Sequence, residues 1–127
     1  MTLNKNDLLE LLQSGKIELG STHKELSFPI IERIYRKMRI GLRFDSIQVA
    51  EYSMIVNGHH RYLASLLAET KLDRVTYPKT SAKEVTPWEN VELVDTDWDT
   101  PTKIKMLNRQ DADYNGMTLE QLTELIS

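Results

Sequence analysis

The chain has 127 residues, no cysteine and a net charge of −3 at pH 7. This length fits one domain that buries a core without disulfide or metal support. The lack of cysteine excludes thiol catalysis, disulfides and cysteine-ligated zinc sites. No apolar run approaches the roughly 18 residues of a membrane-spanning helix, and the first residues lack the apolar stretch of a secretory signal. We therefore expect a cytoplasmic protein that makes no contact with a membrane.

Charge is distributed unevenly along the chain. Residues 24–43 hold six basic and two acidic residues, whereas residues 84–99 hold six acidic residues and no lysine or arginine. The basic stretch suits an anion and the acidic stretch suits a basic protein partner, although two solvated surfaces explain the same pattern. A chain that coats DNA is usually basic along a whole face, so we expect no bulk binding to DNA.

The N-terminal part begins with a clear helical pattern. Leucines at helical spacing predict a short helix over residues 6–14, which ends at Gly15. Residues 16–26 lack a sustained period, although Ile17 and Leu19 alternate as they would in a brief strand.

The next segment predicts a longer helix. Ser27 is typical of a helix N-cap, with Pro29 in the first turn, and apolar residues then follow at helical spacing as far as Gly41. The remaining positions place most of the basic residues on the polar side of this helix, namely Arg33, Arg36, Lys37 and Arg39.

The middle of the chain predicts two strands and a helix. Residues 46–50 and 52–56 are rich in β-branched and aromatic side chains, which favours a hairpin or two neighbouring strands. The chain then turns at Asn57-Gly58 and enters a helix over residues 60–69. The order is therefore strand, glycine turn, helix.

The C-terminal part is less regular. Residues 74–77 and 92–94 predict short strands, and residues 103–108 predict one or two helical turns. Thr118 and Gln121 are spaced for a capping box at the start of a last helix. The whole pattern predicts an α+β fold, with a small mixed sheet flanked by helices.

Residues 57–61 are the ones best suited to chemistry. A strand that turns at a glycine into a helix presents free backbone N–H groups at the positive end of the helix dipole, which suits an anion. Arg61 adds a planar donor for phosphate oxygens, while His59 and His60 can donate hydrogen bonds or transfer protons. We therefore predict that Asn57, Gly58, His59, His60 and Arg61 bind phosphate, with His59 and His60 as catalytic candidates.

Simpler interpretations explain some of these residues. Asn57-Gly58 is also a common tight turn, and the two histidines can serve only as polar residues at the helix start. Adjacent histidines at a helix start point in different directions, so we expect no metal site. Trp88 and Trp98 can anchor an interface, although at least one of them is expected in the core.

Residues 56–64, with the sequence Val-Asn-Gly-His-His-Arg-Tyr-Leu-Ala, resemble the signature of the ParB/sulfiredoxin superfamily. Its members carry a Gly-x-x-Arg motif where a strand meets a helix. The resemblance covers about residues 27–80 and implies a ParB/sulfiredoxin-like core with helical additions at both ends. In this superfamily the junction binds nucleotide phosphates, of ATP in sulfiredoxins and free-serine kinases and of CTP in chromosome-partitioning proteins. It therefore implies ATP or CTP, with magnesium, as ligands for the junction.

The chain departs from each branch of this superfamily. Sulfiredoxins have a reactive cysteine where this chain has His59, and the kinases have an acid where it has Asn57. Reductase chemistry is thus excluded, and Glu51 and Glu32 are the candidates to replace the missing acid. Partitioning proteins continue into a helix-turn-helix domain, for which residues after the motif are too few, so we expect no sequence-specific DNA binding.

Two functions follow from these observations. The first is a catalytically degenerate protein-binding module, such as an immunity protein or antitoxin that neutralises a basic, toxin-like nuclease through an acidic surface. The residues assigned to that surface are Glu89, Glu92, Asp95, Asp97, Trp98 and Asp99. The alternative is a nucleotide-binding phosphotransferase or hydrolase that uses the predicted phosphate site. The missing cysteine, acid and DNA-binding domain favour the first.

Overall fold

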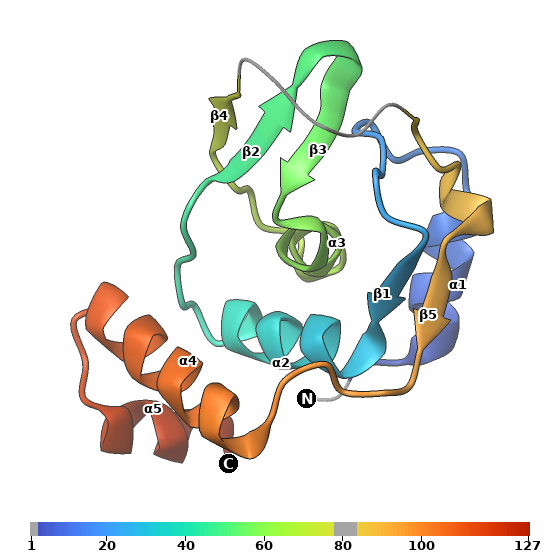
Figure 1. The fold of residues 1–127 in the computed structure, drawn as a ribbon. Coiled ribbons are helices and arrows are strands. Elements are labelled where there is room, and N and C mark those ends of the chain that lie inside the picture. The colour runs from blue at the N-terminus through green and yellow to red at the C-terminus, as the bar shows by residue number, and fades with distance from the viewer. Residues whose placement is uncertain (1–2, 78–83) are drawn as a thin grey trace.

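Five helices and two small sheets make up the described residues, 3–77 and 84–127, of the computed structural model (Figure 1). The helices are α1 (Lys5–Gln13), α2 (Phe28–Arg39), α3 (His59–Ala68), α4 (Pro101–Tyr114) and α5 (Leu119–Ile126). The strands are β1 (Glu25–Ser27), β2 (Ile47–Ala50), β3 (Met54–Asn57), β4 (Arg74–Thr76) and β5 (Glu92–Val94). Two 3-10 turns, η1 (Glu51–Ser53) and η2 (Trp88–Asn90), complete the order. The predicted α+β class is confirmed.

The strands form two sheets rather than the single sheet that we expected. In the three-stranded sheet, β2 pairs antiparallel with β3, as the predicted hairpin requires, and parallel with β4. A separate parallel pair joins β1 to β5. Local patterns could not reveal this second sheet, because its two strands come from distant parts of the chain.

Helix α3 lies at the centre of the fold, between the three-stranded sheet and α2, while α1 covers the β1–β5 pair on one side (Figure 1). The main core fills the space between these elements, and Trp88 belongs to it, as expected for one of the two tryptophans. Its fully buried side chains include Leu8, Leu26, Ile31, Ile47, Ile55 and Leu63. Burial of such side chains stabilises the fold by roughly 1.5–3 kcal/mol each.

A second, smaller core holds α4 and α5 together. It consists of Leu42, Ala112 and Leu122 and the apolar side chains around them. The capping box predicted at the start of α5 is present, because Gln121 N donates to Thr118 Oγ1 and Thr118 N donates to Gln121 Oε1. The two C-terminal helices therefore form a unit with its own apolar centre, beside α2 (Figure 1).

Polar contacts attach this C-terminal unit to the rest of the chain. Lys37 Nζ lies 2.7 Å from Asp111 Oδ2, and the Lys37 side chain is only 6% exposed. At the end of α4, Asn115 Oδ1 accepts from Arg43 N, and Asn115 Nδ2 donates to Arg43 O. Arg36 donates to the Ile126 carbonyl at the end of α5. Several basic residues of the predicted polar helix face are thus bound within the chain.

The predicted elements differ from the observed ones at a few places. Ile17 and Leu19 lie outside the strands, and residues 78–80 of the superfamily resemblance lie outside the described residues. Ser27 occupies the N-cap position of α2, but its hydroxyl donates to Thr96 O at 2.9 Å and does not cap the helix. None of the described helices is long and apolar enough to cross a bilayer.

Candidate functional site

The junction between β3 and α3 has the backbone conformation that the glycine predicted. Gly58 has φ +103°, and a Cβ there would lie 2.5 Å from Ile47 Cγ2. Only glycine fits both the dihedral angle and the space. The first N–H groups of α3 have no intrahelical acceptor, as in any helix, and no side chain caps them, so they lie uncapped at the positive end of the helix dipole.

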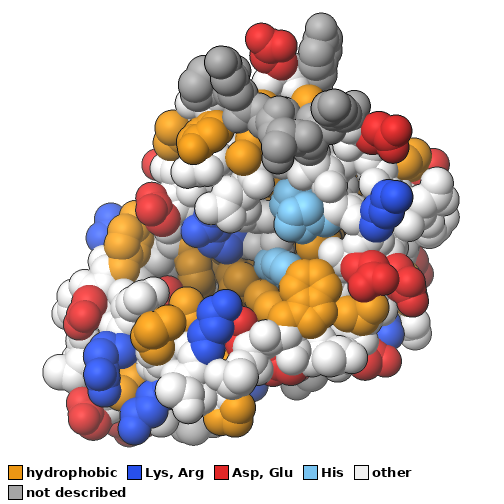
Figure 2. Space-filling view, viewed as in Figure 1, with side chains coloured by type: hydrophobic (Ala, Val, Ile, Leu, Met, Phe, Trp, Pro, Cys, Tyr) orange, Lys and Arg blue, Asp and Glu red, His pale blue; other side chains and the backbone are white. Residues whose placement is uncertain are grey.

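A cleft of about 400 Å³ opens at this end of α3. Its walls come from α2, from the segment after β5 and from α4, and Figure 2 shows the hollow with histidines at one end, hydrophobic side chains on the floor and basic groups beside it. The five residues predicted to bind phosphate all line this cleft. The other lining residues are His23, Ile30, Ile34, Trp98, Asp99, Lys103 and Leu107.

His59 lines the cleft, and its hydrogen bonds fix the tautomer of its ring. Its Nε2 accepts from Thr22 N at 3.1 Å, so the proton of the neutral ring is on Nδ1. The side chain is 2% exposed, yet Nδ1 has no partner. One face of the His59 ring is covered by His23, whose ring stacks on it at a centroid distance of 3.9 Å and an interplanar angle of 11°. The structure thus holds a buried N–H group that lacks an acceptor.

His60 is held in a similar way by the last residue of β1. Its Nε2 accepts from Ser27 N at 3.0 Å, and its ring meets Trp98 edge-on at 5.3 Å. Burial lowers the pKa of His59 to about 3 and that of His60 to about 4, and in both cases the charge of His23 acts in the same direction. Both rings are therefore neutral at pH 7, and both basic nitrogens already accept backbone hydrogen bonds.

These two histidines should make the fold sensitive to mild acid. In the unfolded chain they bind protons near pH 6.5, but in the folded chain they do so only near pH 4 and pH 3. The contribution of the two neutral histidines to the free energy of unfolding is therefore fully present above about pH 6.5. It is lost as the pH is lowered toward 4, by about 1 kcal/mol per pH unit for each histidine. Urea unfolding at several pH values measures this slope.

The matched variant for that measurement is His59→Gln/His60→Gln, because a glutamine carbonyl can still accept from Thr22 N and Ser27 N. Subtracting its pH profile removes the contribution of the carboxylates. Parallel profiles for the two proteins would contradict the histidine assignment.

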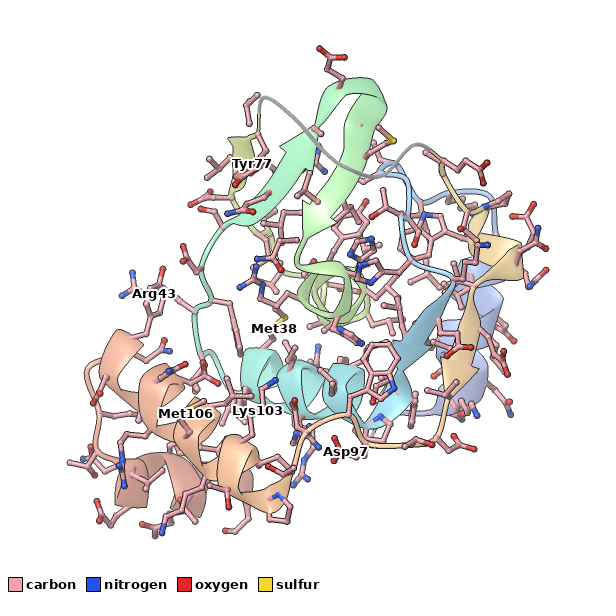
Figure 3. All side chains as sticks on the ribbon, in the orientation of Figure 1. Met38, Arg43, Tyr77, Asp97, Lys103 and Met106 are labelled. Carbon is pink, nitrogen blue, oxygen red and sulfur yellow. The ribbon has the colours of Figure 1, made fainter. Side chains whose placement is uncertain are left out.

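Two cations lie beside the cleft. Arg61 Nη2 donates to Ser46 O at 3.3 Å, while its buried Nε has no partner. Burial lowers the pKa of Arg61, and the charges of Asp45 and Asp111 oppose this effect, so the guanidinium stays protonated. Lys103 extends from α4 on the side toward α2 (Figure 3), and its Nζ lies 3.2 Å from Asp99 Oδ1.

A smaller slot of about 100 Å³ adjoins the cleft between α2 and α4. Ile30, Ile34, Asp99 and Leu107 line both the slot and the cleft. Asn108 lines the inner slot, and its buried Oδ1 has no hydrogen-bond partner. Within residues 3–77 and 84–127, the buried side-chain nitrogen or oxygen atoms without a partner are His59 Nδ1, Arg61 Nε and Asn108 Oδ1. All three belong to residues that border this one cavity system.

The six residues predicted to bind a protein partner do not share one environment. Asp97 and Asp99 are ion-paired with Arg33, at 2.9 Å and 3.0 Å from its Nη2. The Asp99 carboxylate is nearly buried, and Trp98 lines the cleft. The exposed acids that remain in that set are Glu89, Glu92 and Asp95, the last of which pairs with Lys5.

The carboxylates considered as replacements for the missing acid lie elsewhere. Glu51 is exposed in η1, at the far end of the β2–β3 hairpin from Gly58, and Glu32 does not line the cleft. Asp99 does line it, but it already accepts from Arg33 and contacts Lys103. No group of three potential metal ligands occurs among the residues that the structure describes.

Sequence patterns missed the contribution of α4 to this site. Residues 103–108 were expected to form only one or two turns, but α4 has 14 residues. The overlooked signal is Thr100-Pro101, since Thr100 Oγ1 accepts from Lys103 N at 3.2 Å and proline is favoured in the first helical turn.

Comparisons of the chain with known protein families, curated proteins and solved structures found no match. The superfamily resemblance therefore stays a prediction, and the site is interpreted from its own geometry.

Proposed function

We propose that the chain binds a nucleotide in the cleft at the N-terminus of α3, with the phosphates at the junction residues. The observation that carries this proposal is the set of buried polar atoms without a partner. Such groups are uncommon in folded proteins and cost about 1–3 kcal/mol each. Here His59 and Arg61 border the cleft, and Asn108 borders the slot that adjoins it.

The donors in the cleft match a phosphate. The free N–H groups of α3, the Nδ1–H of His59 and the Nε–H of Arg61 are all donors, and a phosphate oxygen accepts from each type. Arg61 and Lys103 supply positive charge, whereas the nearby histidines are neutral. The site is therefore suited to an anion with several acceptor oxygens.

The same geometry favours binding over proton transfer. A general base needs an unoccupied basic nitrogen or oxygen within reach of its proton. The Nε2 atoms of His59 and His60 both accept backbone N–H groups, and their low pKa values make them weak bases. We therefore assign His59 and His60 to ligand binding rather than to catalysis.

Binding of a basic protein partner, as an immunity protein or antitoxin would require, stays a prediction and ranks second. Internal pairing with Arg33 uses two of the acids assigned to that surface. Glu89, Glu92 and Asp95 remain to attract such a partner.

Calorimetric titration with ATP and CTP in the presence of magnesium tests the proposal. We expect binding by the unmodified protein and a loss of affinity of at least tenfold for Arg61→Ala, because a charged hydrogen bond to phosphate is removed. Arg61→Lys should recover part of the affinity, since the charge returns without the planar donor geometry.

Arg109→Ala is the matched control, because Arg109 is an exposed arginine of α4 outside the cleft. Its affinity should equal that of the unmodified protein. Equal affinities for Arg61→Ala and Arg109→Ala, or no binding of either nucleotide, would overturn the proposal.

A further inference from the structure

The slot between α2 and α4 is a separate part of the cavity with its own chemistry. It is lined by Ile30, Ile34, Phe44, Ile104 and Leu107, which make it mainly apolar. The charged groups at its edge are already satisfied, because Lys37 pairs with Asp111 and Arg33 pairs with Asp99. An apolar slot of this kind suits a flat ring better than a phosphate or a sugar.

Asn108 gives the slot a specific polar requirement. Its Oδ1 is a buried acceptor without a partner, and Asn108 lines the slot, so an N–H donor placed against this side chain can supply the missing hydrogen bond once the carboxamide turns toward it. The carboxamide of asparagine is a well-known partner for the amino edge of adenine, because the oxygen accepts from the exocyclic amine. A ring without such a donor would leave the oxygen unsatisfied.

The size and position of the slot fit one end of a nucleotide. A cavity of about 150 Å³ holds a benzene ring, so a slot of about 100 Å³ that adjoins an open cleft can take the edge of a flat base. The slot and the phosphate-binding junction border the same cleft. One ligand can therefore place its phosphates at Arg61 and its base near Asn108.

We propose that the α2–α4 slot is a base-recognition subsite in which Asn108 Oδ1 accepts a hydrogen bond from the exocyclic amine of adenine or cytosine. This inference rests on the proposed nucleotide binding and adds the part of the ligand that α4 recognises. Asn108 is then a residue that determines specificity for the base, and α4 takes part in binding the ligand.

The experiment removes the amine from the ligand and the acceptor from the protein in turn. ATP is compared with purine riboside triphosphate, and CTP with pyrimidin-2-one riboside triphosphate, since each analogue lacks only the amine. We expect the unmodified protein to bind at least one amino-bearing nucleotide about tenfold more tightly than its analogue. Asn108→Leu should bind each member of that pair equally.

One further variant and one further ligand separate the outcomes. Trp98→Leu should keep the preference for the amine, because Trp98 lines the cleft and not the slot. Tripolyphosphate should bind the unmodified protein and Asn108→Leu equally well, which also shows that the variant is folded. If ATP and CTP bind as tightly as their analogues while Arg61→Ala still weakens them, the base subsite is wrong and the proposed nucleotide binding stands. If no nucleotide binds, both proposals fail.

Discussion

Replacing Gly58 by alanine should destabilise the fold by about 3 kcal/mol. An alanine at φ +103° would be strained by about 1–2 kcal/mol. Its Cβ would also lie 2.5 Å from Ile47 Cγ2 and 2.9 Å from Arg61 Nη2. Ile47 is fully buried, so it cannot move away without disturbing the core, and such overpacking costs about 1–3 kcal/mol. The free energy of unfolding in urea measures the total.

Gly41→Ala is the matched control for this substitution. Gly41 has φ +96°, close to that of Gly58, but no atom of the surrounding structure lies within 4 Å of the position that its Cβ would take. The loss of stability in Gly41→Ala should therefore contain only the backbone strain, about 1–2 kcal/mol. Equal losses for Gly58→Ala and Gly41→Ala would show that the contact with Ile47 has no energetic weight.

The second large effect is expected at the contact between α2 and α4. Asp111→Ala leaves the Lys37 ammonium, 6% exposed, without its carboxylate. Removal of one partner of a buried pair costs about 3–5 kcal/mol, and the partial exposure of Asp111 places the expected loss near the lower value, about 3 kcal/mol. Urea unfolding of the variant gives this number directly.

Two companion variants test the cause. Asp113→Ala removes an exposed carboxylate from the same helix and should change stability by less than about 0.5 kcal/mol. Lys37→Met/Asp111→Leu removes both charges and should regain most of the lost stability, because no unpaired charge stays buried. If this double variant is as unstable as Asp111→Ala, packing rather than charge explains the loss.

Local patterns were enough to predict the junction and every described helix except most of α4. The leucine spacing of α1, the glycine turn at Gly58 and the capping box at Thr118 each depend on residues close together in the chain, and the structure confirms all three elements. The five junction residues line one cleft because consecutive residues at a strand-to-helix turn necessarily lie close together.

The parts of the site that depend on distant residues were not predictable in this way. The charge pattern of the sequence predicts separate basic and acidic surfaces, yet Arg33 of the basic stretch is bound to Asp97 and Asp99 of the acidic stretch. The Nε2 atoms of His59 and His60 are occupied by Thr22 and Ser27, more than 30 residues earlier. The spacing of charges or histidines along the chain contains no information about such pairings.

The division of the apolar residues between two cores has a consequence for any bound ligand. The junction leads into Leu63 of the main core, whereas Lys103 and Asn108 lie on α4, which packs with α5 around Leu122. A ligand held by both walls would link two parts of the chain that have different apolar centres, and in proteins such parts often open as separate cooperative units. The apparent affinity of such a ligand would then include the free energy of closing the α4–α5 unit. Substitutions around Leu122 would therefore weaken binding without removing any contact with the ligand.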